Sequence, residues 1–329
     1  MAVRHVLPTL LSALLLVFVV LALIARIRPI TTMPALVLAV GSPYVFLGGV
    51  FGAMLAARRK QAILAVAAVV VSVVSLTVQV PWYYLGRPVD TAPHIELRVL
   101  SSNLRKGQAD PAFLVALANN NADVITVAEL TPEEVRRLKR AGIKKTFPYS
   151  HLLPGPGAGG VGMWSRYPLT ILSVPRHRRV RMPAARLNIP GVRFDPVLAS
   201  VHAYSPVAGE RNTVGDWRIG MAGAKAQLRT FNRIAGPGAV IVGGDYNSTP
   251  DMRQFRDLLT DGYRDAVEQT GSGFAPTYPS DTWYPPLITI DHVLTHNAAA
   301  SSVRTITVPG SDHRALLTTV QVPVDPTAS

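Results

Sequence analysis

Three long apolar segments in the first part of the chain constrain its fold more than any other feature. They span residues 7–24, 33–57 and 61–84. Each is close to the roughly 20 residues with which an α-helix crosses the hydrocarbon core of a bilayer. A cleaved signal peptide is the alternative for the first segment, but two further segments follow it without a clear small-residue cleavage site. The sequence therefore predicts a membrane anchor, residues 1–87, with three transmembrane helices in a multi-pass cell-membrane protein.

Basic residues around these segments bear on the orientation in the membrane. The densest cluster, Arg-Arg-Lys at residues 58–60, lies tightly between the second and third segments. Because such clusters are retained in the cytoplasm, it favours a cytoplasmic N-terminus and an extracytoplasmic remainder of the chain. Arg26, Arg28 and Arg87 on the other side nearly balance this count, so the opposite orientation stays open.

The character of the sequence changes after a linker at residues 88–95. Short β-rich runs alternate with amphipathic stretches, which predicts a mixed α/β domain at residues 96–322 and a tail at residues 323–329. We expect strands at residues 96–102, 123–128, 161–165, 197–203, 239–242, 288–294 and 316–322. We expect helices at residues 111–120, 132–140, 225–234 and 252–259. The residues expected to cap or charge the first turns of these helices are Asp110, Thr131 and Asp251.

Charge and cysteine content narrow the classes of function. The 329 residues include 33 basic and 20 acidic side chains, a net charge of +13 at pH 7. Such a balance suits an anionic partner: a nucleic acid, a phosphorylated lipid or an acidic bilayer surface. The absence of cysteine excludes disulfides, thiolate nucleophiles and cysteine-ligated metals. No protein partner can be inferred from these features.

Polar residues recur at or just beyond the ends of the expected strands. They are Asn103, Glu129, His202, Asp245, Asn247, Asp291, Asp312 and His313. Each alone is typical of a turn or a cap, since Asn and Asp are common there. Because strand ends converge at one rim of a sheet, their repeated position predicts a single polar pocket.

Several motifs that contain these residues occur in the order typical of one enzyme family. They are LRVLSSNLRKG, VITVAEL, GGVGMWSR, LASVHAYSP, IVGGDYNSTP, TIDHVLTH and GSDHRALLTTV. Through them, residues 95–322 resemble the endonuclease/exonuclease/phosphatase (DNase I-like) superfamily. The resemblance implies a four-layered α/β sandwich, with two mostly antiparallel sheets packed face to face and helices outside. With its three apolar segments the whole chain is also similar to membrane-bound bacterial VanJ-like proteins.

The resemblance implies a divalent metal site for Mg²⁺ or Mn²⁺. Glu129 stands at the position of the principal metal ligand, Asn103 would assist it, and Asp312 would bind the metal or fix the neighbouring histidine. Arg105 departs from the family pattern, because some repair nucleases carry a second acid there. The alternative for Glu129 is a strand-end acid that precedes a helix.

The resemblance also implies the catalytic roles of the remaining residues. Asp291 and His313 would form a dyad in which the carboxylate orients the imidazole. Asp245 would orient or deprotonate the attacking water, and Asn247 would hold a phosphate oxygen. His202 would donate to the scissile phosphate or the leaving oxygen, with a structural strand histidine as its alternative.

Three other features have less specific explanations. His292 is expected to point to the opposite face of its strand from Asp291 and to be structural. The basic runs at residues 136–145 and 176–181 could bind substrate phosphates, face solvent or contact anionic lipid. The segment at residues 274–286 is expected to form a surface loop near the pocket that selects substrate.

These observations favour a divalent-metal-dependent phosphoester hydrolase that is tethered to the membrane and acts on a phosphorylated lipid or cell-envelope substrate. An anchored nuclease that cleaves DNA or RNA is the alternative, because a basic protein suits phosphate backbones. A non-catalytic anion- or lipid-binding protein is a third reading.

Overall fold

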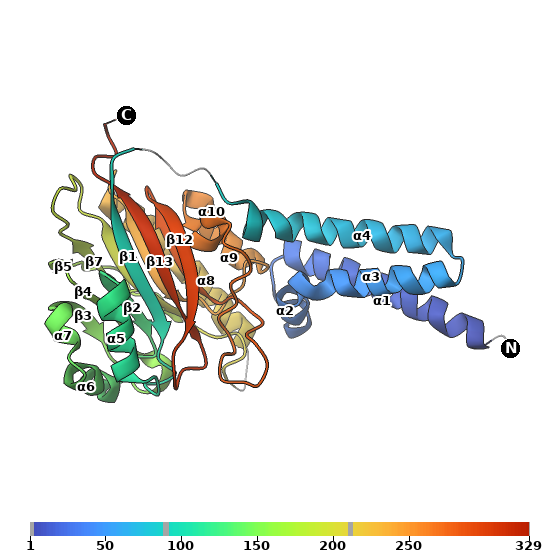
Figure 1. Ribbon diagram of the computed structural model, residues 1–329, viewed down its shortest axis with the longest axis horizontal. Coiled ribbons are helices and arrows are strands. Elements are labelled where there is room, and N and C mark those ends of the chain that lie inside the picture. Colours follow the sequence, from blue (N-terminus) through green and yellow to red (C-terminus); the bar gives the residue numbers. More distant parts are fainter. Residues whose placement is uncertain (1–2, 88–91, 210–212, 329) are drawn as a thin grey trace.

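The computed structural model describes residues 3–87, 92–209 and 213–328, which form a helical part and an α/β part side by side (Figure 1). The helices of the first part are α1 (Val3–Ile27), α2 (Met33–Val40), α3 (Val45–Arg58) and α4 (Ala62–Val80), with short turns at Ser42–Tyr44 and Pro81–Leu85. Helices α1, α3 and α4 project as a bundle. Helix α2 lies at the end of this bundle that faces the α/β part (Figure 1).

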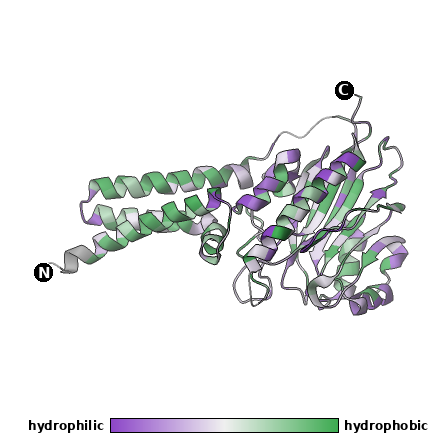
Figure 2. Ribbon diagram, turned by 180° about the vertical axis from the view of Figure 1, so that it is seen from behind, coloured by the Kyte–Doolittle hydropathy of each residue, from purple (hydrophilic) through white to green (hydrophobic). Residues whose placement is uncertain are grey.

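Two helices in the described part of the chain are long and apolar enough to cross a membrane, Leu7–Ile27 and Ala62–Leu85. Most of the residues in these helices are hydrophobic, as the colouring in Figure 2 shows. The prediction of one continuous helix at residues 33–57 is wrong, because Met33–Val40 and Ser42–Arg58 meet at a bend of 46°. Pro43 explains the break, since its ring lacks an N–H donor and clashes with the preceding helical turn. The count of possible spans is two, or three if the bent pair forms one.

Small residues hold the bundle together. Ser12 of α1 donates to the carbonyl of Gly52 on α3 at 2.7 Å. About one turn earlier in α3, a Cβ atom on Gly49 would lie 2.1 Å from the hydroxyl of Ser72 on α4. Lipid is as apolar as these side chains, so the hydrophobic effect does not drive helices together within a bilayer. Small residues instead allow the close backbone approach by which such helices associate.

The α/β part contains two sheets. The first has the order β12 (Ala299–Thr307), β13 (Arg314–Pro323), β1 (His94–Asn103), β2 (Val124–Ala128), β4 (Val161–Ser165) and β3 (Tyr149–Leu153). The second has the order β10 (Arg264–Asp265), β11 (Asp291–His296), β9 (Val240–Asp245), β8 (Val197–Ala203), β7 (Ala184–Leu187) and β5 (Leu169–Ile171), and β6 (Val180–Arg181) pairs with β8. Only the pairs β1–β2 and β8–β9 are parallel among these strands.

Apolar side chains fill the space between the sheets and cover both outer faces. Leu97 and Val99 of β1 pack with Ile241 of β9 in the core between the sheets. Leu100, one residue on from Val99, packs on the outer face instead, because successive strand side chains alternate. The result is the expected mixed α/β sandwich of two sheets, with helices on its outside (Figure 1).

The outer helices differ in length. The first sheet is covered by α5 (Pro111–Asn121), α6 (Pro132–Arg140) and α7 (Ile143–Thr146). The second sheet is covered by α8 (Thr213–Ala235) and α9 (Arg253–Leu258), and α10 (Ala266–Thr270) lies near β12. Helix α8 begins well before the expected residues 225–234. Its first half contains Gly220 and Gly223, which pack closely against Arg179 and His177.

Two of the three expected capping residues act as caps. The Asp110 carboxylate accepts from the N–H groups of Ala112 and Phe113, and the Thr131 hydroxyl accepts from Glu134. Asp251 does not cap α9, whose N-cap position is Met252. Its carboxylate instead accepts from two side chains of the helical part, which local sequence signals cannot reveal.

The helical part packs directly on the α/β part. Gln254 of α9 donates to the carbonyl of Ile30 at 2.9 Å and accepts from its N–H at 3.2 Å. Leu36 and Ala39 of α2 belong to the same buried apolar cluster as Phe255. The position of α2 relative to the sheets is therefore fixed by both polar and apolar contacts.

Candidate active site

The sheet topology brings the strand-end residues to one rim. Strands β1 and β2 run parallel and end at Asn103 and just before Glu129. In the other sheet, Asp245 is paired in register with His202 of β8 on one side and Asp291 of β11 on the other. Because side chains of paired residues lie on the same face, these three groups are neighbours.

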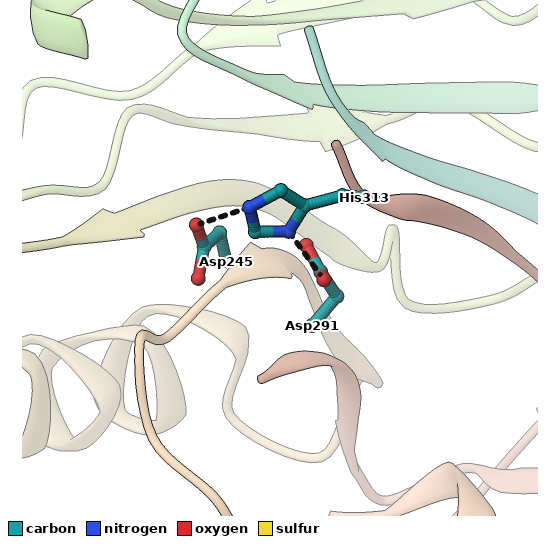
Figure 3. Close-up of side chains that lie close together, drawn as sticks. All are labelled: Asp245, Asp291 and His313. Carbon is teal, nitrogen blue, oxygen red and sulfur yellow. Dashed lines mark hydrogen bonds and ion pairs between the residues drawn. The ribbon is translucent and has the colours of Figure 1, made fainter. Parts of the chain in front are cut away.

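His313 lies between two carboxylates (Figure 3). Its Nδ1 is 2.8 Å from Asp291 Oδ2, and its Nε2 is 4.0 Å from Asp245 Oδ2. All three side chains are buried, and their ligand atoms lie within 4.8 Å of one another. The Asp291–His313 pair therefore has the geometry expected of a dyad, and Asp245 faces its second nitrogen.

Burial and charge shift the proton affinities of this cluster. Burial, together with the nearby charge of Asp291, raises the pKa of Asp245 to about 6. Burial alone would lower the pKa of His313, but the charge and hydrogen bond of Asp291 and the charge of Asp245 raise it to about 10. Between these pH values His313 is a cation and Asp245 is an anion.

Asp291→Asn is expected to lower the pKa of His313 from about 10 toward the ordinary value near 6.5, because it removes the negative charge 2.8 Å from Nδ1. The measurement is a pH titration of the imidazole NMR shifts of His313. The resonances of His292, which pairs with Asp265, serve as the internal control. An unchanged His313 titration would contradict the role given to Asp291.

Asn103 links the carboxylates of Glu129 and Asp245. Its Nδ2 lies 2.9 Å from Asp245 Oδ2 and 3.4 Å from Glu129 Oε1, while its Oδ1 accepts from the N–H of Arg105 at 2.9 Å. The other oxygen of Glu129 accepts from the N–H of Lys106 at 2.7 Å. Asn103 thus holds the carboxylates through its amide nitrogen, and its oxygen faces the loop that follows β1.

His202 and Asn247 complete the network around Asp245. The Nδ1 of His202 is 2.9 Å from the carbonyl of Ala158, which places the proton on Nδ1 and turns Nε2 toward Asp245 at 3.7 Å and Glu129 at 3.9 Å. Asn247 adopts a positive φ of 47°, which Asn tolerates. Its N–H donates to Asp245 Oδ1 at 2.7 Å and its Nδ2 to the carbonyl of Ala203 at 2.9 Å.

Asp312 lies at the edge of this network. Its carboxylate is 3.8 Å from Nε of Arg105, which forms a closer ion pair with Asp281 at 2.8 Å. Sequence reasoning missed the neighbouring Ser311, whose hydroxyl donates to the carbonyl of Asn103 and accepts from the N–H of His313. The only sequence feature that pointed to Ser311 was its position directly before Asp312.

His292 has the structural role expected of it. Its Nδ1 is 2.7 Å from Asp265 and its Nε2 is 2.9 Å from the carbonyl of Ser248, and its side chain is fully buried. It also stacks on Phe255 behind the second sheet. The alternation of strand side chains separates it from Asp291, as the sequence predicted.

A cavity of about 1160 Å³ opens at the rim and includes Glu129, His202, Asn247 and Asp312 in its wall. The basic run at residues 176–181 contributes His177, Arg179 and Arg181 to this wall, whereas the run at residues 136–145 contributes no side chain. The expected substrate-selecting loop contributes Tyr278, whose ring lies 4.9 Å from that of His313.

Solved structures with a similar fold include proteins that are named a 3′ phosphatase and a sphingomyelinase. TDP2 from Caenorhabditis elegans is 14% identical, covers 70% of this chain and 77% of its own, and has a TM-score of 0.56. The 3′ phosphatase NExo from Neisseria, bound to a product DNA hairpin, is 16% identical with coverages of 68% and 98% and a TM-score of 0.53. Sphingomyelinase C from Streptomyces griseocarneus is 18% identical with coverages of 68% and 99% and a TM-score of 0.50.

The comparison with curated proteins finds no matching sequence, so the likeness to VanJ-like proteins stays a prediction. The model of the Endonuclease/Exonuclease/phosphatase family matches residues 100–313, which is most of the α/β part and more than half of the chain. This match begins in β1 and ends at His313, so it includes all the strand-end residues described above. The chain therefore belongs to the endonuclease/exonuclease/phosphatase family of phosphoesterase hydrolases.

Proposed function

We propose that this protein is a divalent-metal-dependent phosphoester hydrolase that is anchored in a membrane and acts on a phosphorylated lipid or cell-envelope substrate. The observation that carries the hydrolytic part is the buried Asp245–His313–Asp291 cluster beside the carboxylate of Glu129. The observations that favour an anchor are the apolar helices α1 and α4.

The charges around the cavity suit a metal ion. Glu129 and Asp245 lie close together, and no Lys or Arg within residues 3–87, 92–209 and 213–328 forms an ion pair with either. Their oxygens are the hard ligands that Mg²⁺ and Mn²⁺ prefer. We propose Glu129 as the main ligand and Asp312 as a supporting one, while Asn103 assists by holding the carboxylates of Glu129 and Asp245 through its amide nitrogen. A bound ion would neutralise charge on the phosphoryl oxygens and acidify a water molecule.

The other residues would position the reacting groups. The charged imidazole of His313 can donate to a phosphoryl oxygen from Nε2, while Asp291 holds its Nδ1. Asp245 is held by Asn103 and Asn247 and can accept a proton from a water molecule. His202 can donate from Nε2 only in its charged form, since its Nδ1 proton already meets the carbonyl of Ala158.

Glu129→Gln is expected to raise the Mg²⁺ concentration for half-maximal activity at least about tenfold, because an amide is a weaker ligand than a carboxylate. The assay is phosphate-ester hydrolysis by the full-length protein across a Mg²⁺ series, with a chelator as the zero point. Glu133→Gln on the exposed face of α6 is the matched control. The same metal dependence in both variants would reject Glu129 as a ligand.

We place the α/β part outside the cytoplasm. The Arg-Arg-Lys cluster at residues 58–60 joins α3 to α4 at the end of the bundle remote from the α/β part (Figure 1). Arg26, at the end of the bundle next to the α/β part, pairs with Asp251 and so has a structural role. We therefore give it less weight when the basic residues on the two sides of the membrane are compared. A periplasmic or cytoplasmic reporter fused after Leu85 tests this orientation.

An anchored nuclease is the second candidate, because Lys106, Arg179 and Arg181 line the cavity and would suit a nucleic-acid backbone. Cleavage of DNA or RNA that falls steeply with added salt would favour it. The apolar part of the same cavity favours the lipid substrate.

A further inference from the structure

The cavity at the rim of the sheets is not built by the α/β part alone. Its opposite wall belongs to the helical part, through Met33, Leu36, Val37, Val40, Gly41 and Tyr44. Leu287, Ile288 and Ile290 from the segment before β11 continue this apolar wall. One cavity therefore joins Glu129, His202, Asn247 and Asp312 of the candidate site to the first helix of the broken second apolar segment.

Helix α2 presents an exposed apolar face to this cavity. Its sequence, MPALVLAV, contains no polar or charged side chain. Met33, Val37 and Val40 follow the i, i+4, i+7 spacing of one helix face; Met33 is 41% and Val37 63% exposed, and Val40 is partly buried against the core. The opposite face carries Ala39, which packs in the core of the α/β part. The buried face thus docks the helix, and the exposed face is open to a ligand.

Contacts on both sides of α2 hold this wall in place. The hydroxyl of Tyr44 donates to the carbonyl of Leu287 at 2.6 Å, and its ring meets Phe274 edge-on. Ile30, just before α2, exchanges two hydrogen bonds with Gln254. The wall is therefore preformed against the catalytic residues.

The other end of the cavity carries basic side chains beside the carboxylates of Glu129 and Asp312. Lys106 and Arg181 line it, and neither forms an ion pair with a carboxylate in the described part of the chain. Arg105 and Arg179, by contrast, are paired with Asp281 and Asp216. The free cations lie at the end that holds Glu129 and Asn247, where an anionic headgroup would be attracted.

We propose that α2 is the chain-binding wall of the active site, so that the substrate is an amphiphile with a phosphoester headgroup and a long hydrocarbon chain. The headgroup lies near Glu129 and Asn247, and the chain lies along Met33, Val37 and Val40. This inference rests on the proposed hydrolytic function. The break at Pro43 creates the wall, because a continuous helix would carry residues 33–40 along the bundle, away from the catalytic rim.

The kinetic test compares two substrates that share one scissile bond. Full-length protein in detergent micelles with Mg²⁺ is assayed on p-nitrophenyl hexadecyl phosphate and on p-nitrophenyl methyl phosphate. Val37→Trp places a large apolar side chain in the cavity beside α2 without adding charge. It is expected to raise KM for the hexadecyl ester about tenfold and to leave KM for the methyl ester unchanged. Val66→Trp on α4 is the matched control, since Val66 is 62% exposed and lies outside the cavity.

A second measurement does not depend on turnover. A hexadecyl phosphonate with a diazirine at the chain end is cross-linked to the wild-type protein, and the labelled peptides are mapped. Labelling of residues 33–44, lost in Val37→Trp and kept in Val66→Trp, is expected. Labelling that is concentrated on the bundle or on other surfaces would overturn the proposal.

The two readouts separate the inference from the proposed function. Labelling of α2 without hydrolysis of either ester would reject the hydrolase assignment and retain the chain-binding wall. Equal hydrolysis of both esters that is insensitive to Val37→Trp would retain the hydrolase and reject the wall. Cleavage of single-stranded DNA in preference to both esters, unaffected by Val37→Trp, would also reject the wall and favour the nuclease.

Discussion

His313→Gln is expected to lower kcat per folded molecule about a thousandfold, because it removes the charged donor that would face the phosphoryl group. Glutamine can still donate one hydrogen bond to Asp291, but it cannot carry the positive charge that lies between Asp291 and Asp245. The measurement is single-turnover hydrolysis of a p-nitrophenyl phosphodiester at saturating Mg²⁺, beside a thermal unfolding scan.

A second buried histidine–aspartate pair in the same chain provides the control for this result. His292 pairs with Asp265 at 2.7 Å, almost the same distance as the 2.8 Å between His313 and Asp291. Both pairs are buried, but His292 lies behind the second sheet with Phe255, whereas His313 faces Asp245, which Asn103 links to Glu129 in the cavity wall. His292→Gln should therefore lower the melting temperature and leave kcat per folded molecule close to the wild-type value. Equal losses of kcat in both variants would count against a chemical role for His313.

Arg26→Ala is expected to destabilise the packing between the helical part and the α/β part by about 3–5 kcal/mol, because it leaves a buried charge without its partner. Arg26 Nε lies 2.7 Å from Asp251 Oδ1, and the Asp251 side chain has no solvent exposure. The same oxygen accepts from Gln79 of α4 at 2.6 Å, so Asp251 joins two apolar helices to the segment before α9. Thermal unfolding of the full-length protein in detergent measures the loss.

The pH dependence and two further variants sharpen this test. Burial raises the pKa of Asp251 even beside Arg26, and loss of Arg26 would raise it further. A carboxyl whose pKa is raised by folding favours the folded state when protonated, so the penalty in Arg26→Ala should shrink as the pH falls. Arg28→Ala on the exposed side should have little effect. The double variant Arg26→Met with Asp251→Leu should recover much of the stability, and failure to do so would argue against an unpaired charge as the cause.

The broken second segment shows how local and tertiary information differ. Residues 33–57 are almost all apolar, as is typical of a membrane-spanning helix. This composition is the same whether the helix is straight or broken. Pro43 is visible in the sequence, but prolines also occur within such helices, as Pro8 does in α1. What separates the two cases is docking: Leu36 and Ala39 enter the core of the α/β part, and Tyr44 bonds to Leu287.

The polar residues at the rim of the sheets were more predictable from the sequence than the strands and helices around them. Asp245 and His202 end strands whose apolar runs are plain in the sequence, and the pairing of those strands then fixes their proximity. Short strands such as β5, β6 and β10 carried no comparable signal, because strands of two or three residues depend on their neighbours for stability. The long helix α8 was also underestimated, since Gly220 and Gly223 weaken the helical signal and are explained only by close contacts with Arg179 and His177.

The sequence by itself determined that apolar helices precede a mixed α/β part, and that acidic, amide and histidine side chains gather at the strand ends. Periodicity and spacing encode these features locally, and the family motifs add the order of the residues. Only the tertiary structure decided that Asp251 pairs with Arg26 and that α2 forms a wall of the active-site cavity. The physical reason is that both depend on contacts between segments more than 200 residues apart, whose energies come from burial and charge pairing that no local pattern records.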